Sequence, residues 1–225
     1  MDRRPTSFTW LSFKIQRLSR PQCLVQLQST LLFEMEETSR LLQAASVLSQ
    51  VLTENTIPHA FHGTILIAIL ANSVQCGEIF CIVEGGTAIH PFGRVRQTIE
   101  GHETLTATIS PWTNRLHVTY TEPIPPVSIE ILPAGEEGPR RLDQTTVARI
   151  RGLPFLSVSE FLRAKLNAWS LHARDPDAQD IVWVMTHYWQ SVDINRIPEQ
   201  DMERFVLSQP LAAPAWAAIK DRFAA

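Results

Sequence analysis

Apolar and polar residues follow two different periods along this chain. From about residue 31 to 52, apolar residues recur at three- and four-residue steps, which predicts a helix with one buried face. Short stretches that alternate, or are apolar throughout, then predict strands at residues 59–62, 78–83, 103–109, 115–121 and 127–132. The helical period returns after residue 157 and predicts helices at residues 157–173, 178–189, 201–207 and 214–225.

The connections between these segments determine the fold class. Gly63 is expected to form a tight turn after the first strand, and residues 64–72 a short buried helix that Thr64 caps with its hydroxyl. The string EGGTAIHPFGR, residues 84–94, is expected to interrupt the regular structure. The order of helix, strands and helices predicts an α+β protein: a small mixed or antiparallel sheet flanked by helices, with a helical C-terminal part.

This pattern also predicts a division of the chain. We expect residues 1–30 to form a leader, either poorly ordered or a docking helix, and residues 31–150 to form the α+β core. Residues 151–225 are then a helical part packed on that core, and the two parts can share one hydrophobic core.

Composition and charge restrict the partners. The chain has 225 residues and a net charge of −3, so no nucleic acid is expected as a partner. The longest apolar run, residues 65–71, is far shorter than the roughly 20 residues of a membrane span, so no membrane is expected. Three cysteines without a metal or redox spacing, and a first segment without a signal-peptide core, favour a cytoplasmic location. A mitochondrial presequence is the alternative, and the oligomeric state is left open.

Several strings resemble one known family. IPHAFHGTILIAILA resembles the strand, glycine turn and helix that open the core of the nucleotidyltransferase superfamily, and GEIFCIV resembles its next strand. VSIEILPAGEEG resembles a later family strand, and GLPFLSVSEFLRAKLNAW followed by DPDAQDIVWVM resembles the C-terminal helices. The resemblance covers about residues 40–190 and is strongest to small antitoxin-type and aminoglycoside-type members from fungi and bacteria. It implies a nucleotidyltransferase-like fold.

The resemblance also assigns positions in the active site. Gly63 falls on the first glycine of the turn, and Thr64 stands where the family has Gly or Ser. Three family carboxylates, which hold two Mg²⁺ ions, fall on Glu78, Phe80 and Glu130. A phenyl ring cannot ligate a metal ion, and Phe80 shares one strand face with Glu78. We therefore expect no metal and no cofactor.

The candidate site residues follow from these positions. The catalytic candidates are Glu78, Glu130, His62 and Lys165, and the candidate substrate contacts are Gly63, Thr64, Phe80 and Trp112. Each polar candidate has a structural alternative: solvated carboxylates at strand ends, a hydrogen-bonded core histidine and a solvated helix lysine.

Three functions are consistent with these residues. The first is a repurposed cleft that binds a small, largely apolar metabolite and catalyses a metal-independent isomerisation or cyclisation, such as a pericyclic closure in a biosynthetic pathway. The second is nucleotidyl transfer with the reduced carboxylate set Glu78 and Glu130. The third is a non-catalytic, antitoxin-like interaction protein.

Overall fold

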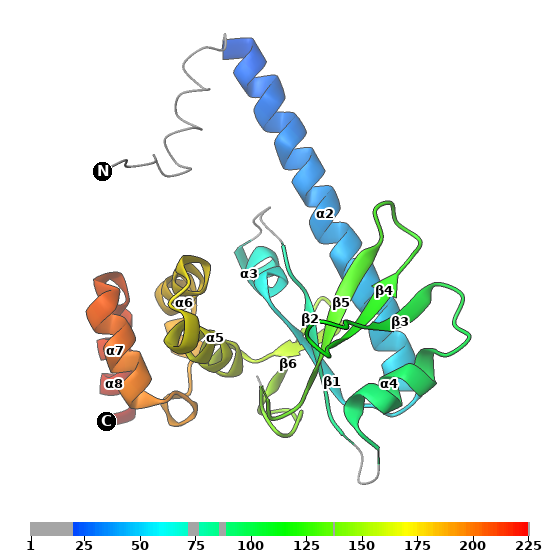
Figure 1. Cartoon of the computed structure of the whole chain (residues 1–225). Helices are drawn as coiled ribbons and strands as arrows, with labels where there is room; N and C mark the ends of the chain where they lie inside the picture. The colour runs from blue at the N-terminus through cyan, green and yellow to red at the C-terminus, as the bar shows by residue number, and fades with distance from the viewer. Residues whose placement is uncertain (1–19, 72–76, 86–88, 137, 225) are drawn as a thin grey trace, which may run out of the picture.

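The computed structural model describes the backbone of residues 20–71, 77–85, 89–136 and 138–224, with side chains from residue 37 onward in the first of these ranges. Most of the expected leader, residues 1–30, lies outside the described residues, and the first described helix begins within it, at Arg20. Figure 1 shows a sheet with helices on its faces and a group of C-terminal helices beside it.

The described elements begin as helices and strands in alternation, continue as a run of strands from β3 to β7, and end in helices. The helices are α2 (Arg20–Glu54), α3 (Thr64–Ala71), α4 (Pro91–Ile99), α5 (Val158–His172), α6 (Asp175–Tyr188), α7 (Glu199–Ser208) and α8 (Ala213–Ala224). The strands are β1 (His59–His62), β2 (Phe80–Val83), β3 (Leu105–Ile109), β4 (Leu116–Tyr120), β5 (Val127–Pro133), β6 (Val147–Ile150) and β7 (Leu153–Leu156). Short 3-10 turns, η1 (Trp189–Ser191), η2 (Ile194–Arg196) and η3 (Pro210–Ala212), connect the last helices.

The described strands form one mixed sheet in the order β3-β4-β5-β2-β1-β7-β6. The pairs β2–β5 and β1–β7 are parallel, and the other neighbouring pairs are antiparallel. Phe61 pairs with Cys81, and Cys81 pairs with Ile131, so these three fully buried side chains lie on one face of the sheet. Residues next to them in sequence point to the opposite face.

Helices α2 and α4 cover the face that carries Phe61. Helix α2 packs against β1, β5 and β7, and α4 packs against β3, β5 and α2. The second half of α2 forms because small and branched apolar residues recur on one side, and Ala44, Ala45 and Leu48 are fully buried there. The main core therefore lies between these helices and the sheet.

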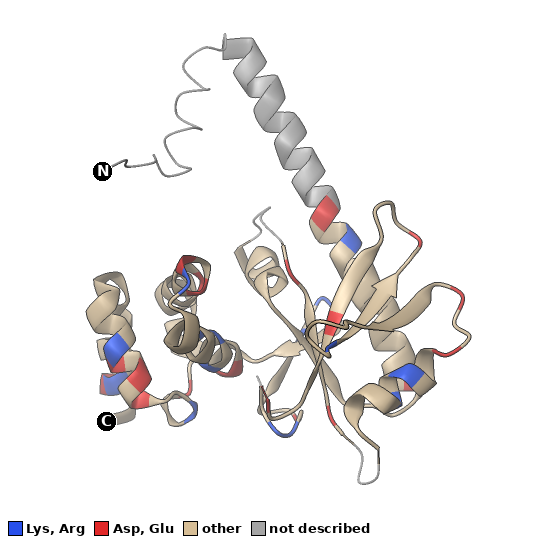
Figure 2. Ribbon diagram, in the orientation of Figure 1, with Lys and Arg blue, Asp and Glu red and all other residues tan. Residues whose placement is uncertain are grey.

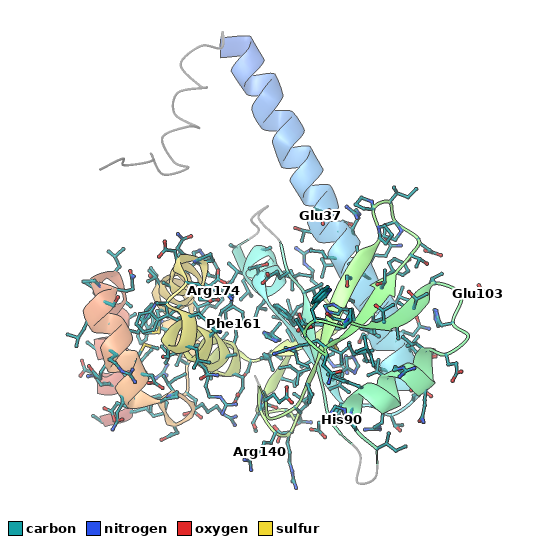
Figure 3. All side chains as sticks on the ribbon, in the orientation of Figure 1. Glu37, His90, Glu103, Arg140, Phe161 and Arg174 are labelled. Atoms are coloured by element: carbon teal, nitrogen blue, oxygen red, sulfur yellow. The ribbon has the colours of Figure 1, made fainter. Side chains whose placement is uncertain are left out.

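The C-terminal helices contain a second group of buried apolar side chains, which includes Leu166, Met185, Phe205 and Trp216. Phe161 of α5 instead belongs to the core of the sheet, and Figure 3 shows it between the sheet and the C-terminal helices. A hydrogen bond from the Tyr188 hydroxyl of α6 to the Leu70 carbonyl of α3, 3.3 Å long, also connects the C-terminal helices to α3.

Most predicted elements are confirmed, including the α+β class, the predicted strands and the Gly63 turn. The expected end of the strand before residues 84–94 is confirmed, since β2 ends at Val83, but helix α4, which begins at Pro91 within that string, was not predicted. The fixed φ angle of proline suits the first helical position, and the His90 side chain accepts a hydrogen bond from the Phe92 amide as a cap. The sheet also continues beyond the expected boundary at residue 150, since β7 lies between β1 and β6.

Within the described residues, each helix is too short or too polar to cross a membrane. Figure 2 shows the acidic and basic positions mainly on helices and connecting loops, while the strands are largely free of them. A charged side chain on a strand is therefore unusual in this protein, and Glu130 of β5, in the candidate site, is one of these.

Candidate functional site

The tight turn after β1 brings two segments of the chain into close contact. Gly63 has a φ of +109°, and a Cβ atom at this position would lie 2.7 Å from the carbonyl oxygen of Glu78 and 3.0 Å from the ring of Phe80. Only glycine combines this backbone conformation with this approach at low cost. The turn is therefore built around the start of β2.

The hydroxyl of Thr64 secures this arrangement. It accepts hydrogen bonds from the amides of Glu78, at 3.0 Å, and Gly77, at 3.1 Å, and lies 3.3 Å from the Glu78 carbonyl oxygen as a donor. The amide of Ile65 also donates to that carbonyl, at 3.4 Å. Thr64 thus connects the first turn of α3 to the chain entering β2, in addition to any role toward a substrate.

A row of side chains crosses the sheet on the face opposite Phe61. His62 pairs with Phe80, Phe80 with Glu130, and Glu130 with His117 in the strand register. Residues directly opposite one another place their side chains on the same face. His62 is buried, and Phe80, Glu130 and His117 are half-buried. We call these four residues the cross-strand row.

His62 is the buried end of the cross-strand row. Its ring stacks on Phe80 with 5.1 Å between ring centroids, and its side chain is 6% exposed. The Nε2 atom is buried without a hydrogen-bond partner. Burial, with a smaller effect from the positive charge of Lys165, lowers the pKa of His62 to about 3. The imidazole is therefore neutral at physiological pH, and its Nε2 atom is an unsatisfied polar group inside the protein.

The two candidate carboxylates have different surroundings. Glu78 is exposed and lies two residues before Phe80, ahead of the first residue of β2. Glu130 is half-buried in β5, and its Oε1 lies 3.1 Å from Nη1 of Arg115. This ion pair occupies one carboxylate oxygen of Glu130 and balances its charge.

Lys165 belongs to an ion-pair network between α5 and α6. Its Nζ atom lies 2.9 Å from Asp177 and 2.9 Å from Asp180. Burial disfavours its charge, but the hydrogen bonds and charges of the two aspartates together outweigh burial and raise the pKa of Lys165. Burial raises the pKa of Asp180, and Lys165 only partly offsets this effect. The alternative of a solvated helix lysine is wrong.

Trp112 lies apart from the cross-strand row. Its side chain is 93% exposed in the turn between β3 and β4. The strand register places this turn at the end of the sheet away from the Gly63 turn and beyond the β5 edge of β2. The structure therefore brings together His62, Gly63, Thr64 and Phe80, and separates Trp112 from them.

The donor set of this face does not fit the two magnesium ions that the fold family implies. Each Mg²⁺ ion requires several oxygen ligands in near-octahedral geometry. Phe80 interrupts the carboxylates, and Glu130 is paired with Arg115. Among the described residues, no three His, Cys, Asp or Glu side chains lie close enough together to hold a metal ion.

Two contributors to this face were missed from the sequence. His117 lies beside Glu130, and Arg115 neutralises the charge of Glu130. The alternation in the string RLHVTYT contained the signal for His117, because it assigns His117 to the less buried side of its strand. The Arg115–Glu130 pair depends on the long-range register of β4 on β5 and has no local signal.

The mixed sheet, the glycine turn leading into α3 and the helical C-terminal part define a nucleotidyltransferase-like fold. Solved structures support this conclusion. The chain is similar to an antigenic nucleotidyltransferase-like protein from Paracoccidioides brasiliensis, with a TM-score of 0.58 and 16% identity over 79% of this chain and 92% of that one. It is also similar to JHP933 from Helicobacter pylori, with a TM-score of 0.50 and 14% identity over 82% of this chain and 80% of that one.

No family model and no curated protein matches the sequence. At these identities the structural similarity establishes the fold alone, because one fold supports many activities. The function must therefore be argued from the residues of the site.

Proposed function

We propose that this protein binds a small, largely apolar metabolite on the cross-strand row and catalyses a metal-independent isomerisation or cyclisation of it. The observation that carries this proposal is the pairing of Phe80 with a buried, neutral His62 whose Nε2 atom lacks a partner. An unpaired buried polar atom is costly in a folded protein, and a bound molecule with a complementary group removes that cost.

The chemistry of the row supports a reaction within one molecule. Isomerisation and cyclisation rearrange the bonds of a single substrate, so neither a metal-bound triphosphate nor a second substrate is required. The half-buried ring of Phe80, supported from behind by the stacked His62, can hold an unsaturated chain or ring in a reactive conformation. The neutral imidazole can hydrogen-bond to a polar group of that substrate in a site of low dielectric constant, where such a bond is strong.

Charged groups flank this surface and set its polarity. Glu130, paired with Arg115, follows Phe80 in the row, and the Lys165 network lies near His62. Arg115 balances the charge of Glu130, and Lys165 balances one of the two carboxylates, Asp177 and Asp180, that contact it. We infer that the preferred ligand is neutral, with an apolar body and one hydrogen-bonding group.

Ligand binding tests this proposal. Calorimetric titration with 2-naphthol, a neutral aromatic compound with one hydroxyl, should show saturable binding to the native protein. Phe80→Ala should weaken this binding at least about tenfold, because it removes the aromatic surface. The control Trp112→Ala should bind as the native protein does. Equal binding by Phe80→Ala and the native protein would refute the ligand site.

A nucleotide titration separates the alternative function. ATP or CTP with Mg²⁺ should leave the melting temperature unchanged, because Phe80 and the Arg115–Glu130 pair leave too few free carboxylates for two ions. A rise in melting temperature that requires both nucleotide and Mg²⁺ would instead support nucleotidyl transfer with Glu78 and Glu130. Phe80→Asp should create Mn²⁺ binding only if these two carboxylates converge on position 80.

A further inference from the structure

A second histidine, at the other end of β1, forms a different arrangement. His59 and His62 are three residues apart on one strand, so their side chains point to opposite faces of the sheet. The Nε2 atom of His59 lies 2.8 Å from the hydroxyl oxygen of Ser49 in α2, and its Nδ1 atom lies 2.9 Å from the carbonyl oxygen of Ile57. The Ser49 hydroxyl, the His59 imidazole and the Ile57 carbonyl oxygen are therefore connected by two successive hydrogen bonds.

The acceptor on Ile57 determines the proton positions. A carbonyl oxygen accepts hydrogen bonds and cannot donate them, so Nδ1 of His59 carries a proton. Burial lowers the pKa of His59; the hydrogen bond to Ile57 opposes this effect and the Arg149 charge adds to it, and the net lowering keeps the ring neutral, with Nε2 unprotonated, at neutral pH. The Ser49 hydroxyl consequently donates its proton toward Nε2. This is the arrangement of a nucleophile, its general base and a group that orients the base.

A cavity of about 700 Å³ gives access to this pair. Both Ser49 and His59 line it, together with residues of the β5–β6 connection and of β6. This volume lies within the range of small-molecule sites. Ser49 is thus buried in the fold but adjoins a space that a substrate can enter.

The charges around the cavity indicate the kind of substrate. Arg149 lines the wall, and its Nη1 atom donates to the Gly152 carbonyl at 3.0 Å, which leaves its other N–H groups for an oxyanion. Asp143 lines the same wall, and its carboxylate accepts hydrogen bonds from the amide and hydroxyl of Thr145. One cation and one anion favour a neutral substrate, such as a small uncharged ester.

We propose that Ser49 is a nucleophile activated by His59, and that this cavity hydrolyses small neutral carboxylic esters. The Ser49 oxygen forms a bond to the ester carbonyl carbon while its proton passes to Nε2 of His59. The ester bond to the alcohol then breaks, and His59 returns that proton to the departing alcohol oxygen. Water, deprotonated by His59, hydrolyses the acyl-serine and restores both side chains.

Labelling with a fluorophosphonate probe tests this proposal, because such probes form a stable bond with activated serine oxygens. The native full-length protein should gain the mass of one adduct, and peptide mapping should place it on Ser49. Ser49→Ala should abolish labelling, and its small volume change should preserve the fold. Ser46→Ala should label normally, since Ser46 is an exposed serine one turn earlier in α2 and outside this cavity.

Two further measurements distinguish activation from accidental reactivity. His59→Gln should slow labelling at least about a hundredfold, the usual contribution of a general base, while circular dichroism verifies its fold. Hydrolysis of p-nitrophenyl butyrate by the native protein should begin with a burst of about one equivalent and disappear in Ser49→Ala. An unlabelled native protein, an adduct on another residue, or equal labelling of Ser49→Ala would overturn the proposal.

Discussion

The buried neutral His62 predicts a specific dependence of stability on pH. The pKa of His62 is about 3 in the folded protein, whereas an ordinary histidine has a pKa of 6.5. Above pH 6.5 both the folded and the unfolded states hold a neutral ring, and His62 contributes no pH dependence. As the pH falls from 6.5 toward 3, the unfolded state gains a proton that the folded state does not, so stability is lost across this window.

The magnitude follows from the difference between these two values. At pH 5 the solution is about 1.5 pH units below the ordinary pKa, and each pH unit changes the free energy of unfolding by about 1.4 kcal/mol. The native protein should therefore lose about 2 kcal/mol between pH 7.5 and pH 5 through His62 alone. By pH 3, where the folded state is itself half protonated, this loss reaches about 4 kcal/mol.

Urea titrations of the native protein and His62→Gln at pH 7.5 and pH 5 measure this effect. A glutamine side chain does not titrate, so the variant should lose about 2 kcal/mol less than the native protein across the same interval. His59 and the carboxylates titrate in both proteins, and their effects cancel in the difference. Equal losses, within about 0.5 kcal/mol, would show that the His62 ring is solvated, and would remove the basis for the proposed ligand site.

Three further substitutions test the contacts that build the site. Gly63→Ala should lower the free energy of unfolding, measured in urea, by about 3 kcal/mol, because its Cβ would collide with the backbone of Glu78. The control Gly101→Ala, in open space at a φ of +76°, should cost only about 1 kcal/mol. Equal costs would contradict the close approach of Gly63 to Glu78. Thr64→Val should cost about 1–2 kcal/mol, because the amides of Gly77 and Glu78 lose the hydroxyl that accepts their hydrogen bonds, and Thr64→Ser should restore most of this loss. No recovery in Thr64→Ser would mean that packing, and not the hydroxyl, is responsible. Lys165→Met should lower the free energy of unfolding by about 3 kcal/mol at pH 7, because it leaves two partly buried carboxylates unpaired. This loss should become smaller toward pH 4, because Asp180, whose pKa is raised, takes up a proton. A loss that does not depend on pH would refute the ion-pair argument.

The sequence contained the local signals for most of the fold. Strand β1 is short and lies between Pro58 and Gly63, and the short, apolar strand β2 follows Gly77; these features identify strands without knowledge of their partners. Helix α4 lacked such a signal, because Gly93 and Pro91 within a nine-residue helix are typical of turns. Its formation depends on burial of Val95 and Ile99 against the sheet.

The candidate site was predictable only in part. The family resemblance placed Phe80 and Glu130 at two of the family's carboxylate positions, and the strand register pairs these two residues directly. The pairing of Glu130 with Arg115 and the unpaired Nε2 of His62 depend on strand register and three-dimensional burial, which local patterns do not encode. The sequence likewise did not identify Ser49 as a candidate nucleophile, because a serine on a helix becomes informative only when the fold places a histidine within hydrogen-bond distance of it.

The position of β7 in the sheet matters for anyone who wishes to shorten this protein. Chain termination at residue 150 would remove β7 from its place between β1 and β6, and the backbone amides and carbonyls along one side of β1 would lose their partners. An unprotected apolar edge of this kind recruits strands from other molecules. A fragment that stays folded and monomeric should therefore retain β7 and α5, the helix that follows it. A shorter fragment should precipitate or form intermolecular β-structure.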